Sequence, residues 1–85
     1  MNVTIRFFAS VREKLGTSSE QIALPEGVTT VGQLRDLLVR RGGAWEEALG
    51  GERALRMACN QAMCNEEAPL ESGAEIAFFP PVTGG

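Results

Sequence analysis

Eighty-five residues are enough for one small domain, and a hydrophobic content of 44% indicates a folded chain rather than a disordered one. Eleven acidic residues outnumber eight basic ones, which gives a net charge of −3, whereas nucleic-acid binders concentrate positive charge on one face. A chain this short also leaves little room for a deep substrate cavity. Composition therefore disfavours two domains, nucleic-acid binding and an enclosed active site.

The cysteine content and the lengths of the apolar runs indicate the cellular compartment of the protein. No stretch approaches the 18 apolar residues of a membrane span, and Arg6 interrupts the N-terminal apolar run, which argues against a signal peptide. Cys59 and Cys64 are too few for a disulfide framework, so we expect buried free thiols in a cytoplasmic protein. The chain has no histidine, and structural zinc usually needs four Cys or His ligands, so no metal site is expected.

The first 16 residues predict a strand followed by a short helix. Val3, Ile5 and Phe7 alternate with polar residues, which is the pattern of a half-buried strand over residues 2–8. Ser10 and Glu13 have the spacing of a capping box, which predicts the start of the helix, and a glycine at position 16 is placed to end it.

The next segment predicts a second strand and the main helix. Ile22 and Leu24 alternate with their neighbours up to the turn residue Pro25. Thr30 and Gln33 form a second capping box, and it opens an apolar stripe at helical spacing made of Val31, Leu34, Leu37 and Leu38.

The second half of the chain predicts smaller elements. Trp45 begins a short apolar segment at helical spacing, which we expect to cover the edge of the core. Alternation then predicts a hairpin over residues 55–64 and a last strand over residues 75–79. One sheet packed on one main helix is the economical arrangement, so the fold class is α+β, with a domain over residues 1–79.

Residues 80–85 are expected to form an extended tail. Pro80 and Pro81 have no N–H for a sheet, so they should end it and direct the chain outward. Six residues reach about 20 Å, which is far enough to enter a partner's buried site. Gly84 and Gly85 lack side chains, so a narrow channel could admit them and the Gly85 carboxylate would be the reactive group.

The sequence FFPPVTGG at residues 78–85 is the most specific motif in the chain, with support from FFA at 7–9, VRE at 11–13, NQ at 60–61 and GAEIA at 73–77. On these motifs the chain resembles the ubiquitin-like β-grasp sulfur carriers, and within them the small subunits of molybdopterin synthase. The resemblance implies a mixed sheet of about five strands packed on one main helix, with short extra helices.

The resemblance also implies a function. An ATP-dependent adenylyltransferase of the ubiquitin-activating type would convert the Gly85 carboxylate to an acyl adenylate, and sulfur would then replace AMP to leave a thiocarboxylate. The tail, made of Pro80, Pro81, Val82, Thr83, Gly84 and Gly85, would enter the large catalytic subunit and donate sulfur to a cyclic pyranopterin precursor in molybdenum cofactor biosynthesis. The chain itself would be non-catalytic, hold no stably bound cofactor and form a heterotetramer of two small and two large subunits.

A docking surface can be inferred beside the tail. If Phe7 and Phe78 face the core, alternation directs Phe8 and Phe79 to the opposite face of the sheet. In a β-grasp sheet the first and last strands are parallel neighbours, so these two rings would lie together where the tail leaves. We expect them to form an apolar patch for the large subunit and the activating enzyme, with Arg12 as a polar contact at its edge.

Three alternatives remain open at this stage. A related carrier could serve thiamin, cysteine or transfer-RNA thiolation through the same glycine pair. A ubiquitin-like modifier would instead join Gly85 to lysines of other proteins. An independent small enzyme is the least favoured, because the chain has no histidine and no recognisable catalytic constellation.

Overall fold

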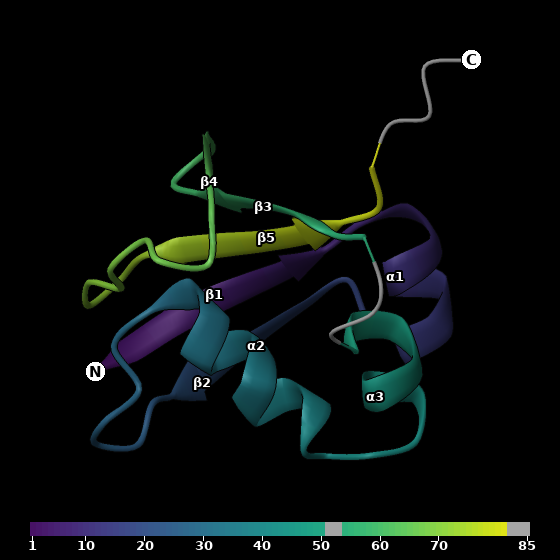
Figure 1. Cartoon of the computed structure of the whole chain (residues 1–85), viewed down its shortest axis with the longest axis horizontal. Helices are drawn as coiled ribbons and strands as arrows, with labels where there is room; N and C mark the ends of the chain where they lie inside the picture. The colour runs from purple at the N-terminus through teal and green to yellow at the C-terminus, as the bar shows by residue number, and fades with distance from the viewer. Residues whose placement is uncertain (51–53, 82–85) are drawn as a thin grey trace.

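A computed structural model describes residues 1–50 and 54–81 of the chain, and Figure 1 shows their arrangement. In chain order the elements are β1 (Asn2–Phe7), α1 (Ala9–Leu15), β2 (Ser19–Ala23), α2 (Val31–Val39), α3 (Ala44–Leu49), β3 (Arg56–Cys59), β4 (Ala62–Cys64) and β5 (Glu75–Phe79). Among these residues, no helix has both the length and the apolar character needed to cross a bilayer.

The five strands form one mixed sheet in the order β2-β1-β5-β3-β4. β1 pairs in parallel with β5 at the centre, while β2, β3 and β4 join by antiparallel pairing. The three helices lie on one face of this sheet (Figure 1). The predicted α+β class and the predicted mixed sheet of five strands are both confirmed.

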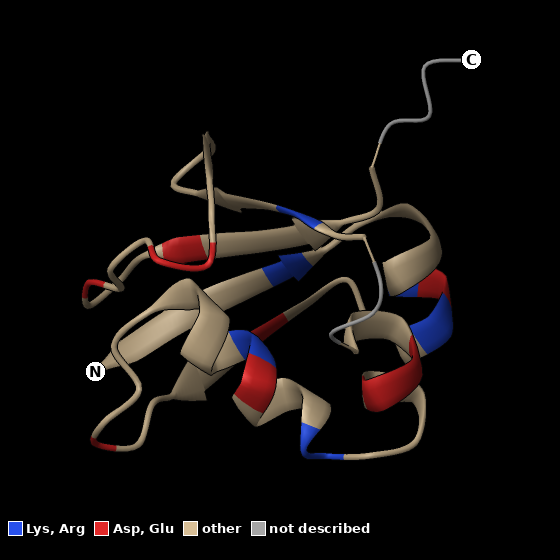
Figure 2. Ribbon diagram, in the orientation of Figure 1, with Lys and Arg blue, Asp and Glu red and all other residues tan. Residues whose placement is uncertain are grey.

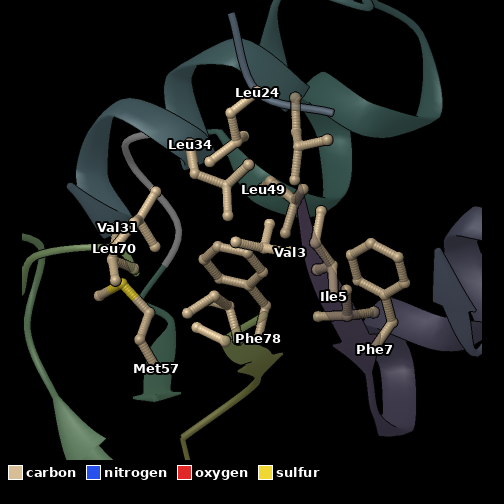
Figure 3. Close-up of a cluster of buried hydrophobic side chains, with 14 of the residues drawn as sticks. Val3, Ile5, Phe7, Leu24, Val31, Leu34, Leu49, Met57, Leu70 and Phe78 are labelled. Atoms are coloured by element: carbon tan, nitrogen blue, oxygen red, sulfur yellow. The ribbon is translucent and has the colours of Figure 1, made fainter. Parts of the chain in front are cut away.

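The core lies between the sheet and the helices. Alternate residues of the central strands point into it, and Ile5, Ile76 and Phe78 are fully buried. α2 and α3 supply the opposite wall through Leu34 and Leu49, as Figure 3 shows. The residues between the buried ones point to the other side of the sheet, which no helix covers, and we call this side the open face.

The predicted start of α1 is wrong. The helix begins at Ala9, its N-cap is Phe8, and no side chain caps it, so Ser10 does not act as the cap. The reason is the turn that follows β1. Ala9 takes a positive φ of 52°, and the Phe8 carbonyl accepts from the amides of Val11 and Arg12, so backbone groups alone start the helix. The C-terminal prediction is confirmed, since Gly16 has the left-handed φ of 71°.

The predicted capping box of α2 is confirmed. The Gln33 amide donates to Oγ1 of Thr30 at 3.2 Å, and the Gln33 side-chain oxygen accepts from the Thr30 amide at 3.1 Å. Three residues of the apolar stripe, Val31, Leu34 and Leu38, have no exposed surface, and the fourth, Leu37, is half-buried.

Arg35, beside the stripe, is a buried charged residue with 5% of its surface exposed. Its Nε donates to the Leu49 carbonyl at 2.7 Å and Nη2 donates to the Gly50 carbonyl at 2.7 Å. Nη1 donates to Oε1 of Glu66 at 2.9 Å. The C-terminal carbonyls of a helix have no partner within the helix, so Arg35 satisfies the end of α3 and joins it to α2.

We predict that Arg35→Met lowers the free energy of unfolding by about 2 to 4 kcal/mol, because buried acceptors lose charge-assisted hydrogen bonds. Urea unfolding followed by circular dichroism measures this change. Arg40→Met at the exposed C-cap of α2 is the matched control and should change stability by less than about 0.5 kcal/mol. Equal effects of the two variants would contradict the structural role of Arg35.

A second ion pair joins the sheet to the loop after α2. Arg41 donates to both carboxylate oxygens of Glu20 on β2, at 2.9 and 2.6 Å, and its guanidinium carbon lies 4.4 Å from the centre of the Trp45 ring. Trp45 in turn meets Phe7 edge to face at 5.6 Å, so its predicted place at the edge of the core is confirmed. The hydrogen bond from Arg41 holds the pKa of the Glu20 carboxyl below its ordinary value, against a smaller opposing effect of burial.

We predict that the stability gained from this pair disappears in acid. Glu20→Gln should lower the free energy of unfolding by up to about 1 kcal/mol at neutral pH. Folding lowers the pKa of Glu20, so this contribution is present above the ordinary glutamate pKa of 4.5 and is lost as the pH falls through the folded-state pKa. Wild type and variant should therefore converge in urea unfolding as the pH falls through the folded-state pKa of Glu20. Glu26→Gln in the exposed loop after β2 is the control, and a wild-type advantage over Glu20→Gln that is constant with pH would refute the prediction.

Candidate functional site

The chain leaves the domain at the end of β5. The strand ends at Phe79, as predicted, and Pro80 is half-buried while Pro81 is exposed. A shallow groove of about 250 Å³ lies at this point, and it is lined by the two prolines and by residues of α1 and α3 such as Val11 and Ala48. The remaining predicted tail residues, Val82, Thr83, Gly84 and Gly85, lie outside the described residues.

Phe8 and Phe79 lie together beside this exit, as predicted. Their ring centres are 6.4 Å apart with an interplanar angle of 85°, which is an edge-to-face contact. The Phe8 amide donates to the Phe78 carbonyl at 3.3 Å, so the pairing of β1 with β5 continues one residue beyond β1. Phe8 is 41% exposed, and we call these two residues the aromatic pair.

The cation beside the aromatic pair is Arg6. Its guanidinium carbon lies 5.7 Å from the centre of the Phe8 ring, and its Nη1 lies 3.6 Å from Oε2 of Glu75. Arg12 is exposed on α1, where its amide donates to the Phe8 carbonyl at 3.4 Å. Its predicted contact with a partner stays a prediction. The alternation that predicted β1 already placed Arg6 on the open face, and this was the signal for its position.

Two further residues share the open face and were not singled out from the sequence. Arg56 on β3 is the cross-strand partner of Phe79, and Met63 on β4 is the partner of Ala58. Ala58 also pairs with Ala77 of β5, so all of these side chains point to the open face. Met63 is 61% exposed, which makes it the most exposed large hydrophobic residue in the described part of the chain. The register of the hairpin is the signal that would have found them.

The two cysteines lie at the edge of the core. Cys59 and Cys64 are both half-buried free thiols that pack against the core. Burial, with a smaller contribution from the neighbouring Cys59, raises the pKa of the Cys64 thiol, which disfavours the nucleophilic thiolate. Within residues 1–50 and 54–81, no cluster of three or more His, Cys, Asp or Glu side chains could hold a metal ion.

The geometry therefore fits recognition of another protein rather than catalysis. Exposed apolar side chains surrounded by charged ones are typical of a protein–protein contact. The aromatic pair and Met63 supply the apolar part, and Arg6 and Arg56 supply charge at its edge. The described chain ends at Pro80 and Pro81 next to this surface, so a partner bound there would lie beside the point where the chain leaves the domain.

Comparison with known proteins supports this assignment. The chain is 40% identical over 83 residues to the molybdopterin synthase sulfur carrier subunit of Escherichia coli, an alignment that covers 98% of this chain and 99% of that protein.

Two solved structures are similar over almost their whole length. The crystal structure of the small archaeal modifier protein 1 of Haloferax volcanii has a TM-score of 0.79 and 26% identity, and the match covers 95% of this chain and 98% of that one. Subunit 1 in the complex of molybdopterin-converting factor subunits 1 and 2 of Helicobacter pylori has a TM-score of 0.70 and 28% identity, with both chains covered completely. With the mixed sheet, these likenesses confirm the ubiquitin-like β-grasp fold.

A model of the ThiS family matches residues 5–85, which is all but the first four residues of the chain. This match takes in the last three residues of β1, which lead to the aromatic pair, as well as β5 and the FFPPVTGG motif at residues 78–85. The chain belongs to the ThiS family.

Proposed function

We propose that this chain is the sulfur carrier subunit of a molybdopterin synthase and contributes no catalytic residues of its own to the complex. The observation that carries the proposal is the 40% identity with the sulfur carrier subunit of Escherichia coli over 98% of the chain. The aromatic pair beside the tail exit supports it, because a carrier needs a surface that aligns its tail with a partner's active site.

Activation would take place at the Gly85 carboxylate. A carboxylate is a poor electrophile, so an adenylyltransferase of the ubiquitin-activating type would transfer AMP from ATP to it and release pyrophosphate. A sulfur nucleophile would then attack the acyl carbon, AMP would leave, and a thiocarboxylate would remain on Gly85. ATP is bound by the activating enzyme, so the carrier requires no resident cofactor.

Sulfur transfer would take place in the large catalytic subunit. Phe8 and Phe79 would dock on that subunit, with Arg12 at the edge of the contact, while the extended tail carries the thiocarboxylate inward. Subunits 1 and 2 of the Helicobacter pylori molybdopterin-converting factor form a protein–protein complex, which supports such an assembly. The acceptor would be a cyclic pyranopterin precursor, and Gly84 and Gly85 would pass where larger residues could not.

A second candidate is a ubiquitin-like protein modifier. It is favoured by the likeness to the small archaeal modifier protein 1 of Haloferax volcanii, at a TM-score of 0.79. Carriers that serve thiamin, cysteine or transfer-RNA thiolation would share the tail chemistry and differ in the acceptor. The chemical state of Gly85 distinguishes a modifier from a sulfur carrier, because a modifier forms amide bonds with lysines and a sulfur carrier holds a terminal thiocarboxylate.

We predict that the protein isolated from its own cells carries sulfur in place of one terminal oxygen on Gly85. Intact-mass measurement with fragmentation locates the change and distinguishes it from oxidation of a methionine or cysteine, which has almost the same nominal mass. A Gly85→Ala variant should accumulate less thiocarboxylate, because the methyl group obstructs a narrow channel. Gly85 found only in amide linkage to other proteins would favour the modifier and refute the sulfur carrier.

We predict that Phe79→Ala weakens binding to the large subunit about tenfold or more, because central aromatic residues dominate interface energies. Its free energy of unfolding should change by less than about 1.5 kcal/mol, since the ring is half-buried on the open face and mainly loses the contact with Phe8. Calorimetric titration and urea unfolding measure the two quantities. Leu37→Ala on α2, also half-buried, is the control and should leave binding unchanged. Normal binding with a large loss of stability for Phe79→Ala would show that the ring is structural.

A further inference from the structure

Charged residues are distributed unevenly along the sheet and the segment that leads into β5. Figure 2 shows acidic residues along the segment between β4 and β5 and at the start of β5, far from the point where the tail leaves. In the sequence these are Glu66, Glu67, Glu71 and Glu75. Basic residues lie on β1 and β3 nearer to the tail exit (Figure 2). A chain with a net charge of −3 therefore presents positive charge next to the aromatic pair.

Arg6 and Arg56 lie on the two sides of β5. Arg6 pairs in register with Ala77 from β1, and Arg56 pairs with Phe79 from β3, so both point to the open face. Both are exposed. The 3.6 Å pair of Arg6 with Glu75 is solvent-accessible on both sides, and such a pair contributes little free energy, so Arg6 can exchange Glu75 for a carboxylate of a partner. Among the residues that the structure describes, Arg56 makes no ion pair.

We infer that the partner surface that docks on the aromatic pair is acidic and places carboxylates opposite Arg6 and Arg56. The inference rests on the proposed function, because it takes the partner to be the large subunit. The rest of the carrier is acidic and would repel such a surface in other orientations. Two cations beside the docking rings would therefore both attract the partner and select the orientation that presents the tail.

A nucleic acid fits this surface less well. Phosphate neutralisation by several basic residues supplies most of the affinity for nucleic acids. Here the described strands place two arginines, Arg6 and Arg56, beside the rings, and Glu75 is close to one of them. Apolar side chains such as Met63 continue the same face, which favours a protein surface with an apolar centre and an acidic edge.

Association kinetics test this inference. Stopped-flow mixing with the purified large subunit of the same organism would give the association rate constant from about 0.02 to about 0.5 M NaCl, over which charge screening becomes strong. The wild-type rate constant should fall about tenfold or more across this range. Arg56→Gln should lower it about three- to fivefold at the lowest salt and flatten its salt dependence, with a dissociation rate constant within about twofold of wild type. Arg6→Gln should act in the same direction.

Arg40→Gln is the matched control, because Arg40 lies at the end of α2, away from the open face. It should retain the wild-type rate constant and salt dependence. Association of wild type and Arg56→Gln with equal rate constants at every salt concentration overturns the inference and leaves the proposed function standing. Failure of the wild type to associate at any salt concentration overturns both. Arg56-dependent binding to a DNA duplex in preference to the large subunit assigns the cations to nucleic acid and also overturns the inference.

Discussion

β1 and β5 lie side by side and parallel at the centre of the sheet, and the other elements take their places around this pair. Parallel neighbours cannot be joined by a tight turn, so the chain between them must cross over the sheet. That crossing carries all three helices on one face and leaves the other open. The pair also ends in register at Phe7 and Phe78, and the next residue of each strand, Phe8 or Phe79, therefore reaches the open face at the tail exit. One backbone pairing thus accounts for both the core and the docking surface.

Sequence reasoning succeeded where a local pattern has one physical meaning. The alternation in β1 and β5 indicates that one face of each strand is buried. The capping box of α2 indicates that the first N–H groups of the helix have acceptors. Each pattern involves residues only a few positions apart. It failed at the start of α1, because the positive φ of Ala9 is set by the turn out of β1 and not by the polar residue at position 10. The burial of Arg35 was also beyond local patterns, since its acceptors at Leu49 and Gly50 are 14 and 15 residues away.

The same distinction explains the site. Phe8 and Phe79 could be placed together from alternation combined with the expected parallel pairing, and the structure confirms this. The positions of Arg56 and Met63 could be found only from the register of β3 against both its neighbours. A slip of one residue in this register would move every side chain of the strand to the opposite face. Alternation alone placed Arg6 on the open face, whereas Arg56 was placed beside the rings only by the assembled sheet, where three strands contribute to one surface.

The position of β5 in the sheet has a consequence for synthesis of the protein. β5 is the last strand along the chain, yet it pairs with both β1 and β3 and separates them. A nascent chain on the ribosome that has emerged only through β4 would lack the strand between β1 and β3, and their facing edges would be unpaired. Contacts of such long sequence separation form late in folding. Synthesis of β5 therefore completes the sheet, and a chain that stopped before this strand would leave both edges open to pairing with other chains.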